Sequence, residues 1–144
     1  YTGEDTLSLH DALPISVDVT AGTLRSTNAN PPQILNNAGT EIGTFCRAWV
    51  NFQGSGANGN QTIRASFNVS SVNRTAATTY VVNFATPITD ANYSIQQMCA
   101  RDGITSTVNA NLEGAPSTTN FTVVTRTGGA SAADPTYVML SIFR

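Results

Sequence analysis

The sequence predicts an all-β fold, an antiparallel β-sandwich of about seven strands. Short runs of alternating apolar and polar residues are separated, roughly every 10 to 20 residues, by turns rich in Gly, Asn, Asp and Pro. No run shows the period of an amphipathic helix. A chain of 144 residues is long enough to bury one core. We therefore expect a single sandwich domain over residues 34–144.

The first strand of this domain is expected at residues 45–52. The even-numbered residues from Cys46 to Phe52 form an apolar face, which we expect to be core. The odd-numbered face, from Phe45 to Asn51, is half polar and carries two aromatic residues, so we expect another subunit or the preceding linker to cover it. Trp49 on this face is interpreted as a packing residue, the alternative being a platform for sugar stacking.

The remaining strands follow in order along the chain. The glycine-rich segment 54–60 predicts a hairpin loop. Further strands are expected at residues 63–69, 80–84, 93–99, 104–112, 121–125 and 137–143. The last run is apolar on both faces, which is typical of a central strand.

The N-terminal 33 residues are not expected to belong to the domain. Residues 6–15, TLSLHDALPI, translate a common short-read sequencing adapter, ACT CTT TCC CTA CAC GAC GCT CTT CCG ATC, and residues 1–5 fit its indexed upstream arm. We expect 1–15 to be adapter-derived, from a metagenomic contig lacking the true N-terminus; the alternative is a turn of amphipathic helix. Residues 16–33, polar and containing Pro31-Pro32, are expected to be a truncated upstream segment or linker.

Composition argues against several functional classes. The chain has seven arginines, no lysine and a formal charge of -2, so no clustered basic surface for nucleic acid is expected. No apolar run reaches the roughly 20 residues of a membrane-spanning helix, so no membrane insertion is expected.

An enzyme is not expected either. The only histidine, His10, lies in the adapter-like segment, which leaves no histidine for a catalytic triad or a metal site. The acids of the remaining chain fall in turns or loops, where Asp commonly serves the backbone; they are Asp18, Glu41, Asp90, Asp102, Glu113 and Asp134. We therefore expect no catalytic residue, metal or cofactor. Cys46 and Cys99 are expected to be buried free thiols, the alternative being a bridge between neighbouring strands.

Five motifs together carry a resemblance to a known family. They are FCRAWVNF at 45–52, TIRASFNVSSV at 62–72, YVVNF at 80–84, DANY at 90–93 and YVMLSIFR at 137–144. In this order they resemble a C-terminal module of tailed-phage structural proteins, especially tail fibres, over roughly residues 34–144. At a coarser level, residues 80–93 look like trimeric phage fibre tips and the H-type lectins, which are small glycan-binding sandwiches.

The resemblance implies a virion protein, the distal part of a tail fibre, assembled in the bacterial host cytoplasm. It implies a homotrimer that attaches the particle to a glycan or protein receptor on the bacterial surface. Residues 98–133 match no pattern we can name, and receptor specificity is expected there. The expected ligand-binding residues are Arg101, Asp102, Asn109, Asn111, Glu113, Arg126 and Asp134. Two alternatives are a purely structural module that trimerises or caps a fibre, and a carbohydrate-binding module of a bacterial enzyme.

Overall fold

The structure, a computed structural model, describes residues 34–101, 108–128 and 131–144. All regular elements of these residues are strands. They are β1 (Ile34–Leu35), β2 (Glu41–Gly43), β3 (Cys46–Phe52), β4 (Gly59–Asn60), β5 (Ile63–Phe67), β6 (Val69–Ala76), β7 (Thr79–Phe84), β8 (Ser94–Ala100), β9 (Val108–Glu113), β10 (Asn120–Thr127) and β11 (Tyr137–Phe143). The adapter and linker predictions, for residues 1–33, fall outside the described residues.

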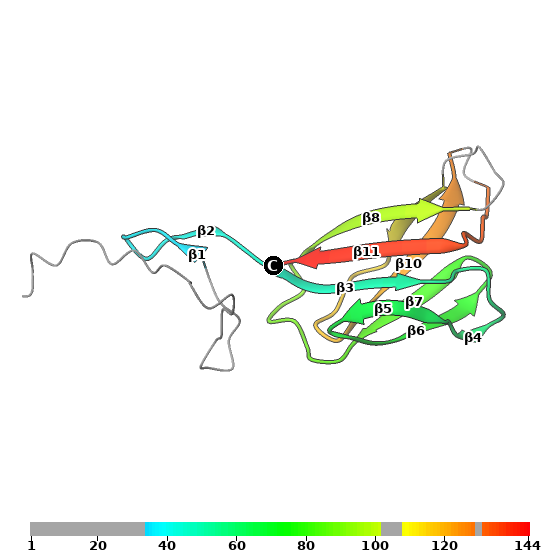
Figure 1. Ribbon diagram of the computed structural model, residues 1–144, viewed down its shortest axis with the longest axis horizontal. Coiled ribbons are helices and arrows are strands. Elements are labelled where there is room, and N and C mark those ends of the chain that lie inside the picture. The colour runs from blue at the N-terminus through cyan, green and yellow to red at the C-terminus, as the bar shows by residue number, and fades with distance from the viewer. Residues whose placement is uncertain (1–33, 102–107, 129–130) are drawn as a thin grey trace, which may run out of the picture. The chain divides into compact units, whose positions relative to one another are not determined.

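Nine of these strands form two antiparallel sheets packed face to face (Figure 1). One sheet has five strands in the order β4-β6-β7-β10-β9, and the other has four in the order β5-β3-β11-β8. β1 and β2 pair only with each other, as a separate two-stranded sheet. The predicted antiparallel sandwich is confirmed.

The strand count of about seven was too low. β6 lies in the polar sequence Val69–Ala76, where Ser, Asn, Arg and Thr dilute the alternation to two buried valines, Val69 and Val72. β4 is only two residues long and lies inside the expected hairpin loop, between the paired strands β3 and β5. Such elements depend on tertiary pairing, which the local pattern does not reveal.

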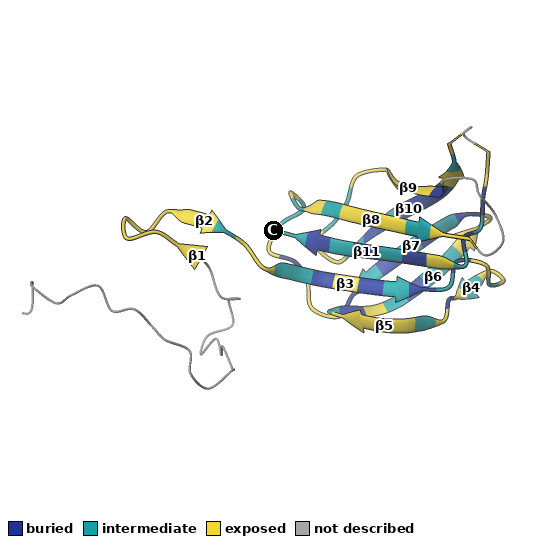
Figure 2. Ribbon diagram, turned by 45° about the horizontal axis from the view of Figure 1, so that its top comes forward, coloured by how far each residue is buried: buried dark blue, intermediate teal, exposed yellow. Residues whose placement is uncertain are grey.

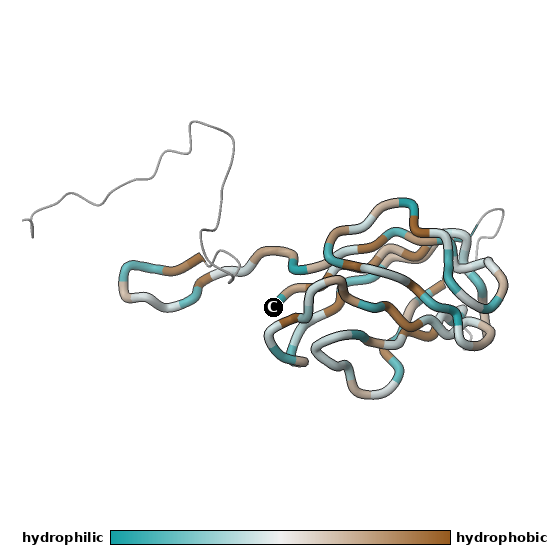
Figure 3. Tube along the Cα trace, turned by 90° about the horizontal axis from the view of Figure 1, so that it is seen from below, coloured by the Kyte–Doolittle hydropathy of each residue, from teal (hydrophilic) through white to brown (hydrophobic). Residues whose placement is uncertain are grey.

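The core lies between the two sheets, as the alternation predicts. Ala48, Val50 and Phe52 of β3 are at most 1% exposed, and Figure 2 shows buried residues alternating with intermediate or exposed ones along β3 and β11. Hydrophobic residues are concentrated in the strands of the sandwich, and the connections are mostly hydrophilic (Figure 3). Each fully buried Val, Leu, Ile or Phe stabilises the fold by roughly 1.5–3 kcal/mol. The other core strands contribute Val72, Tyr80, Val82, Phe84, Ala110, Phe121, Val123, Val138, Leu140 and Ile142.

β11 is central in its sheet, as predicted, because it pairs with β3 on one side and β8 on the other. The face of this sheet that points away from the core carries Trp49, which is 38% exposed, opposite Phe67, which is 55% exposed. Met98 and Tyr137 on the same face are also exposed. Trp49 is therefore not a core residue, and the expectation that a subunit or linker covers this face stays a prediction.

The chain passes from the four-stranded sheet to the five-stranded sheet at Asn68, between β5 and β6. Its φ of 53° is a left-handed conformation, which Asn adopts more readily than most residues. The Asn68 amide donates to the carbonyls of Arg47 at 3.2 Å and Thr86 at 3.1 Å, and its oxygen accepts from the Thr86 N–H at 2.7 Å. One side chain thus ties both sheets together where the chain crosses.

The strands run along the length of the sandwich, so the connections between them lie at its two opposite ends (Figure 1). We call the end with Thr44 and Arg144 the proximal end. There the Thr44 hydroxyl donates to the Arg144 carbonyl, as does the Arg47 guanidinium at 3.3 Å. The opposite, distal end carries the connections from β3 to β4, from β6 to β7 and from β10 to β11.

Candidate functional site

The predicted ligand-binding residues that the structure describes lie at the distal end, along β9 and in a network of polar side chains around Asp134. Those that the structure shows exposed are Arg101, Asn109, Asn111, Glu113 and Arg126. Arg101 follows β8 at the distal end, where Asn109 of β9 also pairs with Arg126 of β10. Asn109, Asn111 and Glu113 share one face of β9, but four residues of strand put Glu113 about 13 Å from Asn109, toward the proximal end. Asp102 lies outside the described residues.

Asp134 belongs to a different environment, an internal polar network. Its carboxylate forms a 2.5 Å ion pair with Arg74, and their side chains are 34% and 13% exposed. It also accepts hydrogen bonds from the Thr78 N–H at 3.1 Å and the Tyr80 hydroxyl at 3.0 Å. With its oxygens engaged by three groups of the protein, Asp134 helps to hold the distal end together, and its predicted contact with a ligand stays a prediction.

The same network includes Tyr80 and Gly54. The single hydrogen of the Tyr80 hydroxyl is shared between the Gly54 carbonyl at 2.5 Å and the Asp134 carboxylate at 3.0 Å, and burial, reinforced by Asp134, raises the pKa of Tyr80 well above its ordinary range. The Gly54 N–H donates to the Pro135 carbonyl at 3.1 Å. A Cβ on residue 54 would lie 2.8 Å from that carbonyl oxygen, so only glycine allows this approach. At least one glycine of the segment after β3, Gly54, is therefore required by close packing against Pro135.

A cleft of about 300 Å³ opens between β8 and β9, the edge strands of the two sheets. Its lining residues are Tyr93, Ile95, Gln97, Ala110, Asn111, Leu112, Val123 and Leu140. Among the predicted binding residues, only Asn111 lies here. Gln97 and Leu112 were missed, although a polar residue on the otherwise apolar side of the strand at 93–99 was a signal in the sequence.

Tyr93 closes the proximal side of this cleft. Its hydroxyl donates to the Ser117 carbonyl at 3.0 Å, and its ring packs edge-on against Phe84 at 5.7 Å. Burial raises the pKa of Tyr93 to about 12. The residue therefore remains a neutral phenol at physiological pH and supports the cleft as a fixed wall.

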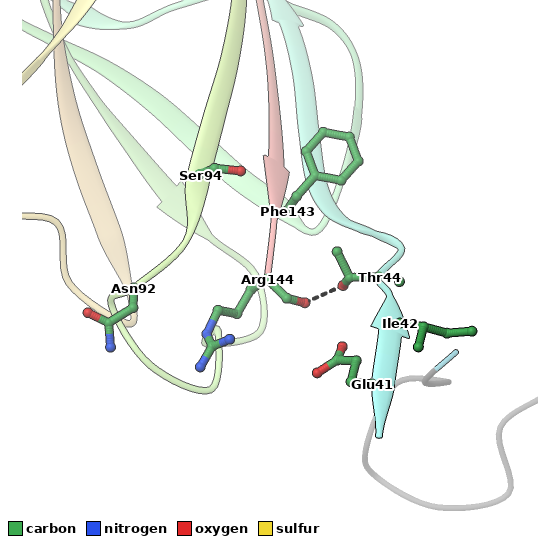
Figure 4. Close-up of a pocket in the computed structure, with 8 residues that line it drawn as sticks. Glu41, Ile42, Thr44, Asn92, Ser94, Phe143 and Arg144 are labelled. Atoms are coloured by element: carbon green, nitrogen blue, oxygen red, sulfur yellow. Dashed lines mark hydrogen bonds between the residues drawn. The ribbon is translucent and has the colours of Figure 1, made fainter. Parts of the chain in front are cut away.

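A second groove, of about 420 Å³, lies at the proximal end (Figure 4). It is lined by Glu41, Ile42, Gly43, Thr44, Asn92, Ser94, Phe143 and Arg144. Arg144 makes a two-pronged pair with Asp90, Nε–Oδ1 2.9 Å and Nη2–Oδ2 2.6 Å, which lowers the pKa of Asp90 to about 2. This groove lies where the flanking chain meets the sandwich, and none of the predicted binding residues lines it.

The two cysteines are free, as expected, and half-buried. They flank β11 on opposite sides, Cys46 opposite Phe143 and Cys99 opposite Val138. Five residues of strand separate these positions by roughly 16 Å, far beyond the reach of a disulfide. The alternative of a bridge between neighbouring strands is therefore wrong. Burial raises the pKa of Cys99 to about 11, so this thiol is protonated and unreactive at neutral pH.

Two further searches cover only the described part of the chain. No group of three or more His, Cys, Asp or Glu side chains that could hold a metal ion occurs among residues 34–101, 108–128 and 131–144. Within the same ranges, no helix is long and apolar enough to cross a membrane.

Comparison with known proteins gives no relative: no family model, curated protein or solved structure matches the chain. The likeness of residues 34–144 to a tail-fibre module, and the coarser likeness to H-type lectins, therefore stay predictions.

Proposed function

We propose that the chain is a phage virion protein, the distal domain of a tail fibre, which binds a receptor on the bacterial surface. A surface glycan is the favoured receptor and a surface protein the alternative. The role is non-catalytic, the protein is located in the phage tail after assembly in the host cytoplasm, and the functional unit is a homotrimer. The series of motifs from residue 45 to residue 144 is the sequence support for this proposal.

One observation carries the proposal furthest: the start of β3 and the end of β11, the first and last strands of the sandwich, lie together at its proximal end. Thr44 and Arg144 are hydrogen-bonded there, so any further chain at either side of the domain extends from that end. The distal end is left to loops and to the exposed pair Asn109 and Arg126. A fibre domain needs this polarity, with attachment at one end and recognition at the other.

The chemistry of the distal surface suits a glycan. The exposed amides of Asn109 and Asn111 and the guanidinium groups of Arg101 and Arg126 offer hydrogen-bond donors and acceptors suited to sugar hydroxyls. Arg74 and Asp134 pair with each other and help to hold the distal end of the scaffold. Preorganised side chains on a rigid scaffold reduce the ordering cost of binding.

The test is binding of the purified full chain to a panel of bacteria and to a glycan array. The double variant Asn109→Ala/Arg126→Ala should lose binding, because it removes the polar pair at the distal end. Thr118→Ala, exposed in the proximal connection from β9 to β10, is the control and should bind like the wild type. Absence of binding to every cell type and glycan would overturn receptor recognition.

A purely structural, trimerising module is a second candidate, favoured by the apolar outer face of the four-stranded sheet. Trp49, Phe67, Met98 and Tyr137 on this face are all at least 36% exposed. Contiguous exposed apolar residues commonly mark association surfaces. Light scattering should give a trimer mass for the wild type and a monomer mass for Phe67→Asp, with Asn109→Asp on the other sheet as control. A stable trimer that binds no cell and no glycan would leave only this role.

A further inference from the structure

β8 is an open edge of the four-stranded sheet, and it differs from the other edges of the sandwich. In the described part of the chain, one sheet ends in β4 and β9 and the other in β5 and β8. An edge strand presents unpaired backbone N–H and C=O groups, with which a strand of another chain can pair. Proteins usually protect such strands by short length, charge, irregular pairing or a covering group.

The other three edges are protected in these ways. β4 is only two residues long. β5 carries Arg64, and its register with β3 skips this residue as an irregularity. On β9, Glu113 adds a charge, and Gln97 Oε1 accepts the hydrogen bond of the Ala110 N–H. Pairing with a further strand is therefore disfavoured at each of these edges.

β8 lacks these protections over Ser94–Ala100. Its seven residues include no charged residue, no proline and no glycine, and they pair with β11 without a register shift. Most of them are exposed (Figure 2). A long, regular and uncharged edge of this kind is a template for pairing with another strand.

The sequence of β8 suits pairing with a copy of itself. Two antiparallel copies related by a twofold axis at Gln97 bring only neutral residues together, so no like charges meet across the axis. The two Met98 side chains, each 65% exposed, become diagonal neighbours on the outer face of the joined sheet, within reach of each other. The opposed residues are Ser94 and Ala100, Ile95 and Cys99, and Gln96 and Met98.

We propose that β8 pairs antiparallel with β8 of a second copy of this chain and joins the two four-stranded sheets into one. The inference goes beyond the proposed function, because it concerns the edge of a sheet and not the distal residues proposed to bind a receptor. The pairing does not use Trp49 or Phe67, which lie on β3 and β5, away from β8. It is therefore compatible with a trimer formed through those residues.

Sedimentation equilibrium of the full chain over a range of concentrations tests the pairing. One pair of strands is a small interface, below the roughly 1,200 Å² of stable complexes, so we expect a dissociation constant on the order of 0.1 mM. The mass of the wild type should rise at least about twofold between about 10 µM and about 1 mM protein. The rise is measured from the mass at the lowest concentration, whether that is a monomer or a trimer.

Three variants test the edge and its register. Gln96→Lys/Met98→Lys places two lysines directly opposite each other on either side of the axis, and their repulsion should abolish the rise in mass. Gln96→Glu/Met98→Lys puts as many charged residues on the same face but places each glutamate opposite a lysine, so the rise should remain. Ala65→Lys is the control, because Ala65 lies in the same row of the sheet as Met98 but on the opposite edge strand, β5. Its mass should rise as in the wild type.

Each outcome decides for or against the pairing. A rise in the wild type, in the glutamate–lysine variant and in Ala65→Lys, but not in the double lysine variant, would support it. A constant mass of the wild type would overturn self-pairing and leave the edge to a strand of another protein. A rise that survives the double lysine variant, or is lost in both double variants, would also overturn the proposed register.

Discussion

At each end of the sandwich one polar side chain ties together segments that meet there, but the two residues differ in charge. At the distal end, Asp134 joins Arg74 of β6 and Tyr80 of β7, and Tyr80 reaches Gly54 after β3. At the proximal end, the neutral amide of Asn68 joins the carbonyls of Arg47 and Thr86. Both side chains thus bond groups that lie at or near the ends of strands.

The difference in charge between Asp134 and Asn68 determines how much stability each end of the sandwich should lose when that residue is replaced. Arg74 is 13% exposed, its Nε is buried without a hydrogen-bond partner in the described part of the chain, and its counter-charge there is Asp134. Asn68 brings no charge into the protein, and its loss exposes only neutral groups. We therefore expect the distal end to respond more strongly to substitution, and the following variants test that order.

The largest effect is expected for Asp134→Asn. The variant keeps the shape of the side chain but leaves the Arg74 guanidinium without a counter-charge, which should lower the free energy of unfolding by roughly 2–4 kcal/mol. Urea unfolding measures this change. A double-mutant cycle with Arg74→Gln should recover part of the loss; additive effects would contradict the pairing.

Asn68→Ala should follow, with a loss of roughly 2–3 kcal/mol, because it removes three hydrogen bonds and puts Ala, which adopts the left-handed conformation less readily than Asn, at this position. Asn68→Gly is the matched control. This variant loses the same hydrogen bonds, but glycine adopts the left-handed conformation readily, so the variant should be more stable than Asn68→Ala by roughly 1 kcal/mol. Equal stability of the two variants would show that backbone strain plays no part.

Tyr80→Phe should cost less, roughly 1–1.5 kcal/mol, because the ring stays in the core and only the hydroxyl is lost. The Gly54 carbonyl then loses its donor, and Asp134 keeps Arg74 and Thr78. Urea unfolding at pH 7 measures the change. A loss as large as that of Asp134→Asn would show that the hydroxyl, and not the ion pair, closes the distal end.

The smallest effect is expected for Asp90→Asn, which breaks the exposed pair with Arg144. Solvent and salt screen such pairs, so no change in the midpoint of unfolding should be resolved at physiological salt. The pKa of Asp90 falls from about 4 in the unfolded chain to about 2 in the folded chain. Its contribution is therefore present above pH 4 and lost as the pH falls toward 2.

At low salt, stability measured from pH 6 to pH 2 should fall less steeply for Asp90→Asn than for the wild type. Parallel curves would contradict the assignment of this pKa to the pair with Arg144.

The strands that the sequence predicted best are those in which the apolar residues of the alternating pattern are buried in the core. β3 and β11 were expected within one residue of their bounds, because every second residue from Ala48 to Phe52 and from Val138 to Ile142 is apolar and buried. β6 was missed, because only Val69 and Val72 carry the pattern and pairing with β7 completes the strand. Alternation of apolar and polar residues predicts a strand only where one face is buried, and in a strand as polar as β6 too few apolar residues remain to show the pattern.

The candidate site was harder to predict than the fold. Asn109 and Arg126 were both expected to bind, but their pairing across β9 and β10 follows from register, which the turn sequences alone do not fix. Asp134 was expected to bind a ligand, and the sequence did not reveal that it also pairs with Arg74, which lies 60 residues earlier in the chain. The cleft depends on which strands end each sheet, a property of topology.

The central claim is that recognition takes place at the distal end. Hydrogen–deuterium exchange of the full chain, with and without bacterial surface polysaccharide to which it binds, tests the claim most directly. We predict protection of the distal halves of β9 and β10 and unchanged exchange in residues 85–93 and 114–119 at the proximal end. Protection confined to those proximal residues, or to the face around Trp49 and Phe67, would contradict the claim.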